Sequence, residues 1–529
     1  MTRTLRPHKT RYSKPKAIML KCSALIMSAC LLSACTSAVG QQTTAANGEP
    51  VAGGTVRIGT TSDLTPALVF SGTKASEQTL TGLVYDTLVS YPADSLDPQP
   101  RLAENWEVSP DGLTLTLELR KNVTFHDGRP FTSKDVEFSL QTYSDPAYAG
   151  QLARVAQLIT KYDTSDPHRI VLELEDRANN IFDLFSIVPI IDKNSFDQWV
   201  NGEEYIGTGA FEFVVWYPGS RIEFEANKEY WDGAPAVNGA ELLVIPDQQT
   251  QFSQLRSGQL DLLADALPRD IKAVEDSPTF NVVTTQGTGS MVYAGANVTA
   301  PGLEDPRVRQ AISLAVDRDR IVKEVYQDRA RATSLPWPEY SPAYEPSADA
   351  PQRDVALAKK LIDQVGSIPT ITISYGSNSL EHQDIAQIIS ANLAELGIET
   401  KLEPVEYTTM ISQLRNGSFP GLWVLGHGFA QYNPATLVTS AFPFNSIKNS
   451  SNFSHDAYAA DVQRSWRTTD PNSTSALDAY KDLNKHLLEQ SFVIELASPD
   501  SEFITSGNLH GIGWSKRGEL DLSDVYFTQ

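Results

Sequence analysis

The first 35 residues constrain this chain most, because they separate an export signal from the part that folds. Residues 1–16 carry six basic side chains and no acid, and residues 22–32 form an apolar run behind Lys21. This run of about 11 residues is shorter than the roughly 20 that a permanent membrane span needs. A basic segment, a short apolar segment and small residues after it are typical of an export signal.

The signal ends in Leu32-Ser33-Ala34-Cys35, which resembles a bacterial lipobox, where a diacylglycerol is attached to the Cys and the chain is cut before it. We therefore expect a signal peptide over residues 1–34 and a lipid on Cys35. A plain secretory signal is the alternative. Cys22 and Cys30 would leave with the signal, so the exported chain would hold one cysteine, without an internal disulfide or thiolate metal site.

Removal of the signal changes the charge of the chain. Seven of the 43 Lys and Arg residues, and none of the 65 Asp and Glu residues, lie in residues 1–34. The remainder has 36 basic and 65 acidic residues, a net charge of −29, which argues against nucleic acid as a partner and suits an exported soluble body. Residues 35–53 are small and polar and predict a flexible tether.

Localisation follows from these two features. The lipid on Cys35 would hold the body at the membrane, although one lipid signal anchors more weakly than several chains. We expect a monomer outside the cytoplasm, on the outer face of the plasma membrane or in the periplasm.

Helical and strand patterns alternate along the remaining chain. Residues 53–60 predict a strand after a Gly pair, and residues 80–89 have helical spacing. Leucines alternate with polar residues over 113–119, the period of a strand with one wet face. Residues 385–396 form an amphipathic helical pattern and 398–402 a following strand. This alternation predicts α/β lobes.

Residues 121–140 raise a choice between a catalytic loop and a structural turn, because they hold His126 beside an acid and two hydroxyl residues. A strand is expected to end near Phe125, with a turn after it. Thr132 and Asp135 then have the spacing of a capping box at a helix start. The pattern favours a turn residue at position 126 over a catalytic base.

Seven segments carry a resemblance to a known family, and they follow one another in the family's order. They are "LVYDTLVSY" (83–91), "RLAENWEVSPDGLTLTLELRKNVTFHDGRPFTSKDV" (101–136), "IGTGAFEF" (206–213), "NKEYWDGAP" (227–235), "SGQLDLL" (257–263), "DPRVRQAISLAVDRDRIV" (305–322) and "AQIISANLAELGIETKL" (386–402). Together they resemble the extracellular solute-binding proteins of family 5, the peptide- and nickel-type binding components of ABC importers. The resemblance spans nearly the whole exported chain.

The resemblance implies an α/β fold with two lobes, the periplasmic-binding-protein-like (type II) arrangement, in which the ligand is buried between the lobes on closure. The larger lobe should hold residues 54–285 plus 490–529, with an inserted subdomain near 91–203. The smaller lobe should hold residues 286–489. The chain should pass between the lobes near residues 283–292 and 492–497.

The function implied is capture of a small solute, oligopeptide or peptide-like, and its delivery to an ABC permease and its ATPase subunits. No chemistry and no cofactor are expected. A metal chelate of the nickel type, or another non-peptide solute, is the alternative. The sequence contains no G-x-S-x-G, H-E-x-x-H, P-loop or C-x-x-C motif, which disfavours an exported hydrolase. A structural lipoprotein is the remaining alternative class.

The most informative departure from the family lies in residues 421–437. Peptide-binding members carry an Asp four residues before a Pro, and its carboxylate pairs with the α-amino group of the peptide. Here the Pro is Pro434, the matching residue is Ala430, and no Asp or Glu occurs anywhere in the segment. Because a buried ammonium needs a compensating charge, capture of a free amine is not expected at this position.

The same segment supplies candidates for the cleft wall, since Gly426 and Gly428 allow close backbone approach. Its polar and aromatic residues could instead pack the core or cap a strand. Other candidates follow strand ends that face the cleft in the family, and they could equally be packing, turn or helix-cap residues. No catalytic residue and no metal ligand is expected. The ligand-binding candidates are Asp63, Ser290, Met291, Tyr293, Tyr375, Ser377, His427, Phe429, Gln431, Tyr432 and Asn433.

Overall fold

The structure is a computed structural model. It describes residues 49–66, 72, 74–148, 150–264, 266–285, 290–349 and 353–529 of the 529-residue chain. The signal peptide, Cys35 and most of the expected tether lie outside the described residues. The described residues belong to one compact unit. Within the described part, no helix is long and apolar enough to cross a membrane.

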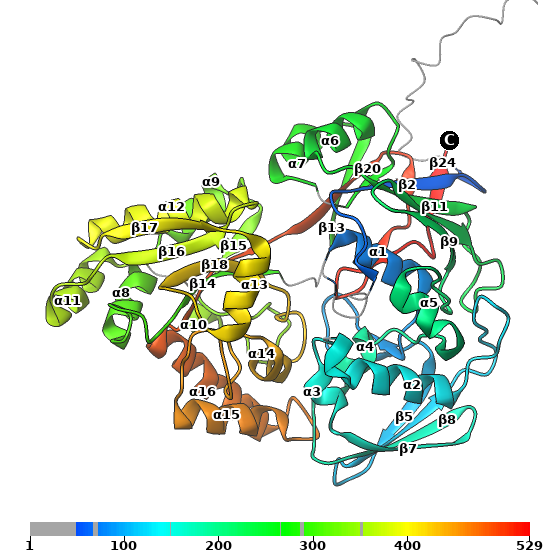
Figure 1. Cartoon of the computed structure of the whole chain (residues 1–529), viewed down its shortest axis with the longest axis horizontal. Helices are drawn as coiled ribbons and strands as arrows, with labels where there is room; N and C mark the ends of the chain where they lie inside the picture. The colour runs from blue at the N-terminus through cyan, green and yellow to red at the C-terminus, as the bar shows by residue number, and fades with distance from the viewer. Residues whose placement is uncertain are drawn as a thin grey trace, which may run out of the picture. The chain divides into compact units, whose positions relative to one another are not determined.

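A seven-stranded sheet forms the centre of what we term the large lobe (Figure 1). α1 (Ala75–Val84) packs on one face, while α6 (Gln248–Arg256) and α7 (Pro268–Val274) pack on the other. Neighbouring residues of a strand therefore enter different cores, as Leu262 and Leu263 do. In order, the strands are β13 (Phe280–Thr285), β20 (Ser501–Ser506), β12 (Leu262–Leu263), β2 (Thr55–Thr60), β11 (Gly239–Val244), β10 (Arg221–Ala226) and β9 (Phe211–Tyr217).

A four-stranded antiparallel sheet in the large lobe confirms the alternating leucine pattern. Its order is β5 (Ala103–Val108), β6 (Thr114–Leu119), β8 (Arg169–Leu174) and β7 (Ile159–Asp166), and α2 (Ser133–Ser144) packs against it. Leu115, Leu117 and Leu119 are buried, while the residues between them are partly or fully exposed. The short elements of the chain are β1 (Pro50–Val51), β3 (Val89–Ser90), β4 (Gln99–Pro100), α3 (Ala153–Ala156), α4 (Ile181–Ile187), α5 (Phe196–Asn201), α10 (Pro346–Asp349), β21 (Leu509–His510), β22 (Gly513–Trp514), β23 (Leu520–Asp521), β24 (Tyr526–Thr528) and two 3₁₀ turns, Pro146–Tyr148 and Lys193–Ser195.

Two expected boundaries in this lobe are wrong. The helix expected over residues 80–89 is α1, which begins at Ala75 and ends at Val84. The helix ends there because Tyr85 has an extended backbone, and the Val84 carbonyl oxygen accepts from the Gly209 N–H at 2.9 Å. The strand expected to end near Phe125 ends at Leu119. Thr124 instead forms an isolated bridge with Pro130, which closes the turn between them.

His126 lies in this turn and uses both ring nitrogens on backbone groups. Its Nδ1 accepts from the Gly207 N–H at 3.3 Å, and its Nε2 lies 3.0 Å from the Gly209 carbonyl oxygen, so Nε2 carries the proton. Burial lowers the pKa of the imidazole. The capping box is confirmed, because the Asp135 carboxylate accepts from the Thr132 N–H at 2.8 Å. The His126 side chain therefore attaches this turn to the backbone of residues 206–211.

The Asp86 carboxylate joins four of the segments that carry the family resemblance. Oδ1 accepts from Arg101 and from the Tyr230 hydroxyl. Oδ2 accepts from the Thr208 hydroxyl at 3.0 Å and from the Trp231 indole N–H at 2.8 Å. The carboxylate is buried, with Asp86 only 2% exposed. One carboxylate thus contacts residues from segments 83–91, 101–136, 206–213 and 227–235, which gives a structural reason for these segments to occur in the same chain.

Gly207 packs closely against the backbone at Val84, so a larger residue at this position should destabilise the fold. A Cβ added there would lie 1.9 Å from the Val84 carbonyl oxygen, and backbone cannot move aside as a side chain can. Gly207→Ala is expected to lower the free energy of unfolding by about 3 kcal/mol, measured by urea denaturation. Gly513→Ala is the control, because its Cβ would meet nothing closer than 3.4 Å. Equal loss in both variants would contradict the steric explanation.

A six-stranded sheet forms the centre of the small lobe (Figure 1). Side chains of β14 and β18 alternate between two cores, so Val292 and Val424 face one helical layer while Tyr293 and Trp423 face the other. The strand order is β15 (Ala330–Ala332), β19 (Val493–Pro499), β14 (Met291–Ala296), β18 (Leu422–His427), β16 (Ile371–Gly376) and β17 (Thr400–Val405). One layer contains α8 (Pro306–Ala315), α9 (Arg318–Glu324), α11 (Val355–Val365) and α12 (Leu380–Glu395), and the other α13 (Tyr407–Asn416), α14 (Pro434–Ser440), α15 (Asp456–Trp466) and α16 (Thr474–Gln490).

The chain passes between the two large sheets twice. It leaves the seven-stranded sheet at the end of β13 and enters the six-stranded sheet at β14. It returns from β19 to β20, with Asp500 as the one residue between them. β13 pairs with β20, and β14 pairs with β19, both antiparallel.

Candidate ligand-binding cleft

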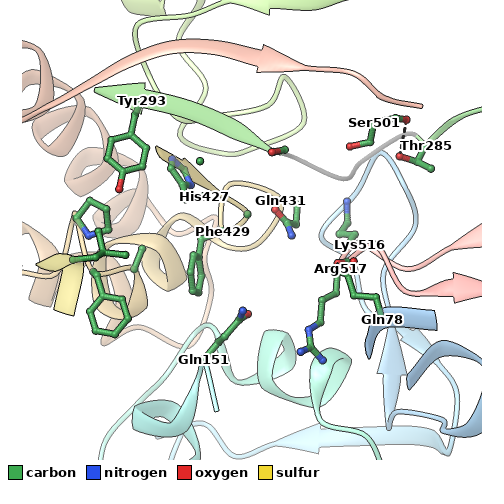
Figure 2. Close-up of a pocket in the computed structure, with 18 of the residues that line it drawn as sticks. Gln78, Gln151, Thr285, Tyr293, His427, Phe429, Gln431, Ser501, Lys516 and Arg517 are labelled. Carbon is green, nitrogen blue, oxygen red and sulfur yellow. Dashed lines mark hydrogen bonds between the residues drawn. The ribbon is translucent and has the colours of Figure 1, made fainter. Parts of the chain in front are cut away.

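A cleft of about 470 Å³ lies between the two lobes (Figure 2). The small lobe contributes the ends of β14 and β18 and the loop that follows β18. The large lobe contributes α1, the ends of β13 and β20, and the loop between β22 and β23. The polar and aromatic lining residues are Gln78, Gln151, Thr285, Ser290, Tyr293, His427, Phe429, Gln431, Phe442, Ser501, Phe503, Lys516 and Arg517.

On the small-lobe wall, the His427 ring is fixed from behind. Its Nε2 lies 3.1 Å from Glu495 Oε1 in β19, and the two side chains are only 4% and 2% exposed. The ring also packs against Phe444 and Tyr293, with centroid distances of 5.2 and 5.7 Å. Its Nδ1 has no hydrogen-bond partner among the described residues, and neither has Gln431 Oε1. The wall therefore offers two buried polar atoms for a ligand to bond.

On the large-lobe wall, Arg517 is held on both sides. Its backbone oxygen accepts from Gln78 Nε2 at 2.6 Å, which ties the loop to α1. Its Nη1 donates to Glu519 Oε1 at 3.0 Å, and both side chains are buried. Burial raises the pKa of the Glu519 carboxyl, while Arg517 acts to lower it. The guanidinium charge is therefore balanced by a carboxylate behind the wall.

Lys516 differs from its neighbour. Its Nζ donates to the Ala93 carbonyl oxygen at 2.8 Å and lies 3.9 Å from the centre of the Tyr340 ring. No carboxylate oxygen among the described residues lies within ion-pair distance of it. Burial lowers the pKa of the ammonium to about 8, although Asp94 and Asp183 act to raise it. Lys516 is thus a buried cation at the cleft without a paired anion.

Beside the cleft, a set of hydrogen bonds joins the two lobes. The Asp183 carboxylate, in α4, accepts from the Asn433 N–H at 3.1 Å and the Thr436 hydroxyl at 2.5 Å, both at the start of α14. Tyr91, in the same lobe as Asp183, donates to the other oxygen at 2.9 Å. Burial raises the pKa of Asp183 to about 6, against the lowering effect of the Thr436 and Tyr91 hydrogen bonds. The carboxylate thereby connects the two lobes.

Five of the expected cleft residues line it: Ser290, Tyr293, His427, Phe429 and Gln431. Phe429 also packs on the cores of both lobes. The position where the resemblance leads one to look for an amine-pairing acid is Ala430, which is fully buried. Among the described residues that line the cleft there is no Asp or Glu.

The other six candidates lie elsewhere or serve another contact. Asp63 accepts from the Trp216 indole at 2.8 Å and the Gly219 N–H, which ties the end of β2 to the β9–β10 turn. Met291 is fully buried in β14, Tyr375 lies in β16 and Ser377 follows it, and none of the three lines the cleft. Tyr432 packs in the large-lobe core and lines a second cavity of about 240 Å³, which shares Lys516 and Arg517 with the cleft. Asn433 caps α14.

Several lining residues were not predicted, above all Gln78, Gln151, Lys516 and Arg517. None belongs to a motif, and each comes from a different part of the chain than the segment at 421–437. No sequence signal singled them out, because Lys516 and Arg517 are adjacent basic residues but so are Arg120 and Lys121, and Lys359 and Lys360. The described residues include no group of three or more His, Cys, Asp or Glu placed to hold a metal ion.

Comparison with protein families gives one match over much of the chain. Residues 97–449 match the family described as bacterial extracellular solute-binding proteins, family 5 Middle. The chain is also 26% identical over 476 residues to the probable di/tripeptide-binding protein 5 of Pseudomonas aeruginosa, covering 84% of this chain and 90% of the relative.

Solved structures share the fold. The ABC transporter-associated periplasmic binding protein DppA from Helicobacter pylori, in complex with the peptide STSA, has a TM-score of 0.75 at 24% identity, covering 90% of this chain and 99% of that one. NikZ from Campylobacter jejuni, in complex with Ni(L-His), has a TM-score of 0.75 at 22% identity, covering 88% and 97%. These likenesses confirm the two-lobed α/β fold.

Proposed function

Because the chain belongs to the bacterial extracellular solute-binding proteins of family 5, we propose that it is the substrate-binding component of an ABC importer and captures oligopeptides or peptide-like solutes. Family members act outside the cytoplasm with ABC permease and ATPase subunits. The observation that carries the proposal is the cleft of about 470 Å³ with walls from both lobes. Its volume falls within the range of small-molecule sites, roughly 300–1,000 Å³.

The proposal also includes the absence of turnover, the lipid anchor and the bounds of the two lobes. The relatives are binding proteins, and this chain performs no turnover in our proposal. A lipid on Cys35 holds the monomeric body at the membrane after residues 1–34 are removed. The large lobe comprises residues 54–285 and 490–529, with an inserted subdomain at about 91–203, and the small lobe 286–489. The strands' division between two large sheets supports this arrangement.

Among the predicted cleft residues, we propose that Tyr293, His427, Phe429 and Gln431 contact the solute, because they line the cleft. Ser290 lies at its edge near the first passage between the sheets. Met291, Tyr375 and Ser377, away from the lining, and Asp63, Tyr432 and Asn433, with their own packing or hydrogen bonds, are proposed to support the walls.

A metal chelate is the second candidate function, and one observation favours it. Peptide capture by the α-amino group requires a buried acid, and none of the described residues that line the cleft is one. A chelate or other non-peptide solute needs no such acid. The two candidates differ in the mass of the bound solute, which a single measurement distinguishes.

Native mass spectrometry of the full exported chain tests both candidates. We expect adducts whose masses correspond to peptides of mixed sequence, released on mild denaturation. An adduct containing a metal would favour the chelate. The peptide proposal is wrong if no added peptide library produces an adduct, while small-angle scattering curves stay the same with and without solutes.

A further inference from the structure

The charged groups around the cleft are unevenly balanced. Arg517 has Glu519 at 3.0 Å, and His427 has Glu495 at 3.1 Å, so these two lining residues each have a carboxylate behind them. Lys516 is the exception, since no carboxylate lies within 4.0 Å of its Nζ among the described residues, although it is only 6% exposed. A buried ammonium without a partner is costly, and an anion in the cleft would offset that cost.

The geometry of Lys516 leaves it able to donate. An ammonium has three N–H donors, and one of them goes to the Ala93 carbonyl oxygen at 2.8 Å. Tyr340 covers one side of the ammonium and also donates its hydroxyl to the Gln431 carbonyl oxygen at 3.3 Å. The side chain therefore stands at the boundary of the cleft, in a fixed position, with donor capacity remaining.

Across the cleft, Gln431 faces Lys516 from the small lobe (Figure 2). Gln431 is 5% exposed, and its Oε1 is buried without a hydrogen-bond partner among the described residues. A carbonyl oxygen of this kind accepts from a neutral amide N–H. It cannot balance the full charge of an ammonium, which requires a carboxylate when buried. The two walls together match a solute that has an acid group and an amide.

Building on the proposed function, we propose that the cleft selects solutes that carry a carboxylate and no free ammonium, such as N-acylated peptides, and that Lys516 pairs with the carboxylate. The pairing is a charge-assisted hydrogen bond between Nζ and a carboxylate oxygen. Gln431 Oε1 accepts from an amide N–H of the same solute. Recognition would then come from the acidic end of the solute, and a blocked amino end would be preferred.

End-capped peptides test this selection on the full exported chain. Four pools of random tripeptides differ only at their ends: the amino group is free or acetylated, and the carboxyl group is free or amidated. Native mass spectrometry measures how much of the protein each pool occupies. The acetylated pool with a free carboxylate should bind best, and amidation should weaken binding at least about tenfold.

Substitution at Lys516 makes the test specific. Lys516→Met keeps an unbranched side chain, one atom shorter, and removes its charge, so the variant should lose the preference for a free carboxylate. Lys228→Met is the matched control, because Lys228 is exposed and lies outside the cleft lining, and it should behave as the unsubstituted protein. Circular dichroism and the midpoint of thermal unfolding establish that both variants are folded.

Each result decides between the two proposals. A preference for the free-amine pools, or a carboxylate preference that survives Lys516→Met, overturns the inference and leaves peptide binding intact. If folded protein binds none of the four pools, peptide binding itself fails, and the inference fails with it. Loss of the carboxylate preference in Lys516→Met alone supports the inference.

Discussion

Asp183→Ala is expected to weaken solute binding by about 30-fold, close to 2 kcal/mol, because it removes the acceptor that joins the lobes beside the cleft. The Asn433 N–H and the Thr436 hydroxyl would lose that acceptor when the lobes close. Leaving two buried donors unsatisfied costs roughly 1–3 kcal/mol each, and removal of a buried charge offsets part of this. Calorimetric titration with a solute that binds the unsubstituted protein measures the change in affinity.

Two matched variants separate lobe closure from damage to the large lobe. Tyr91→Phe removes the hydrogen bond to the same carboxylate from within the large lobe and should change affinity little. Asp183→Asn retains an oxygen for the small-lobe donors and should stay within a few-fold of the unsubstituted protein. If Tyr91→Phe weakens binding as much as Asp183→Ala, the carboxylate does not act through closure.

The same residue gives closure a pH dependence. Burial raises the pKa of Asp183 to about 6 where the two lobes contact each other, and a hydrated Asp has a value near 4. Bringing the lobes together therefore takes up a proton between about pH 4 and 6. Closure is favoured at lower pH and weakens as the pH rises through 6, because the buried carboxyl must then be ionised, while its hydrogen bonds to Asn433 and Thr436 remain. Affinity should rise about tenfold from pH 7 to pH 5 relative to Asp183→Asn.

Asp86→Ala is expected to have the largest effect on stability, a loss of about 5 kcal/mol in the free energy of unfolding. The carboxylate receives hydrogen bonds from Arg101, Thr208, Tyr230 and Trp231. Its removal leaves a partly buried guanidinium and three neutral donors without their acceptor. Urea denaturation followed by circular dichroism measures the loss, provided that the variant folds at low temperature.

Milder substitutions keep this prediction testable if Asp86→Ala does not fold. Trp231→Phe removes one of the four donors and keeps an aromatic ring, so it should cost about 1–2 kcal/mol. Asp86→Asn keeps the size of the side chain but removes the charge that pairs with Arg101, and its loss should lie between the other two. A loss below about 1 kcal/mol in Asp86→Asn would show that the carboxylate charge contributes little.

Elements with a strong local period could be predicted from the sequence. The alternating leucines at 113–119 predicted β6, and the apolar face at 385–396 predicted α12, because each pattern depends only on neighbours along the chain. The helix at 80–89 was misplaced for the opposite reason. It ends before Asp86, whose partners lie 15 to 145 residues away in sequence, and no local pattern contains that information.

The residues of the cleft divide in the same way, into those that a local sequence pattern could predict and those that it could not. His427, Phe429 and Gln431 could be identified because one short segment supplies them. Lys516 is nearly a hundred residues away, and it reaches the cleft only because the chain returns to the large lobe after β19. The contact between Asp183 and α14 was likewise not predicted. The acid lies in one helix and its partners lie at the start of another, and no sequence pattern connects the two.

The paired strands between the sheets also determine what kind of movement the lobes can make. Thr285 pairs with Ser501 at the large-lobe end of the passage, and Val292 with Ala497 at the small-lobe end, so the two crossings leave each lobe as neighbouring strands. Two neighbouring crossings let the lobes rotate about them more readily than slide past each other, because sliding would break the cross-strand hydrogen bonds at both ends. Opening should therefore follow one coordinate, and a single pair of spectroscopic labels would be enough to track it.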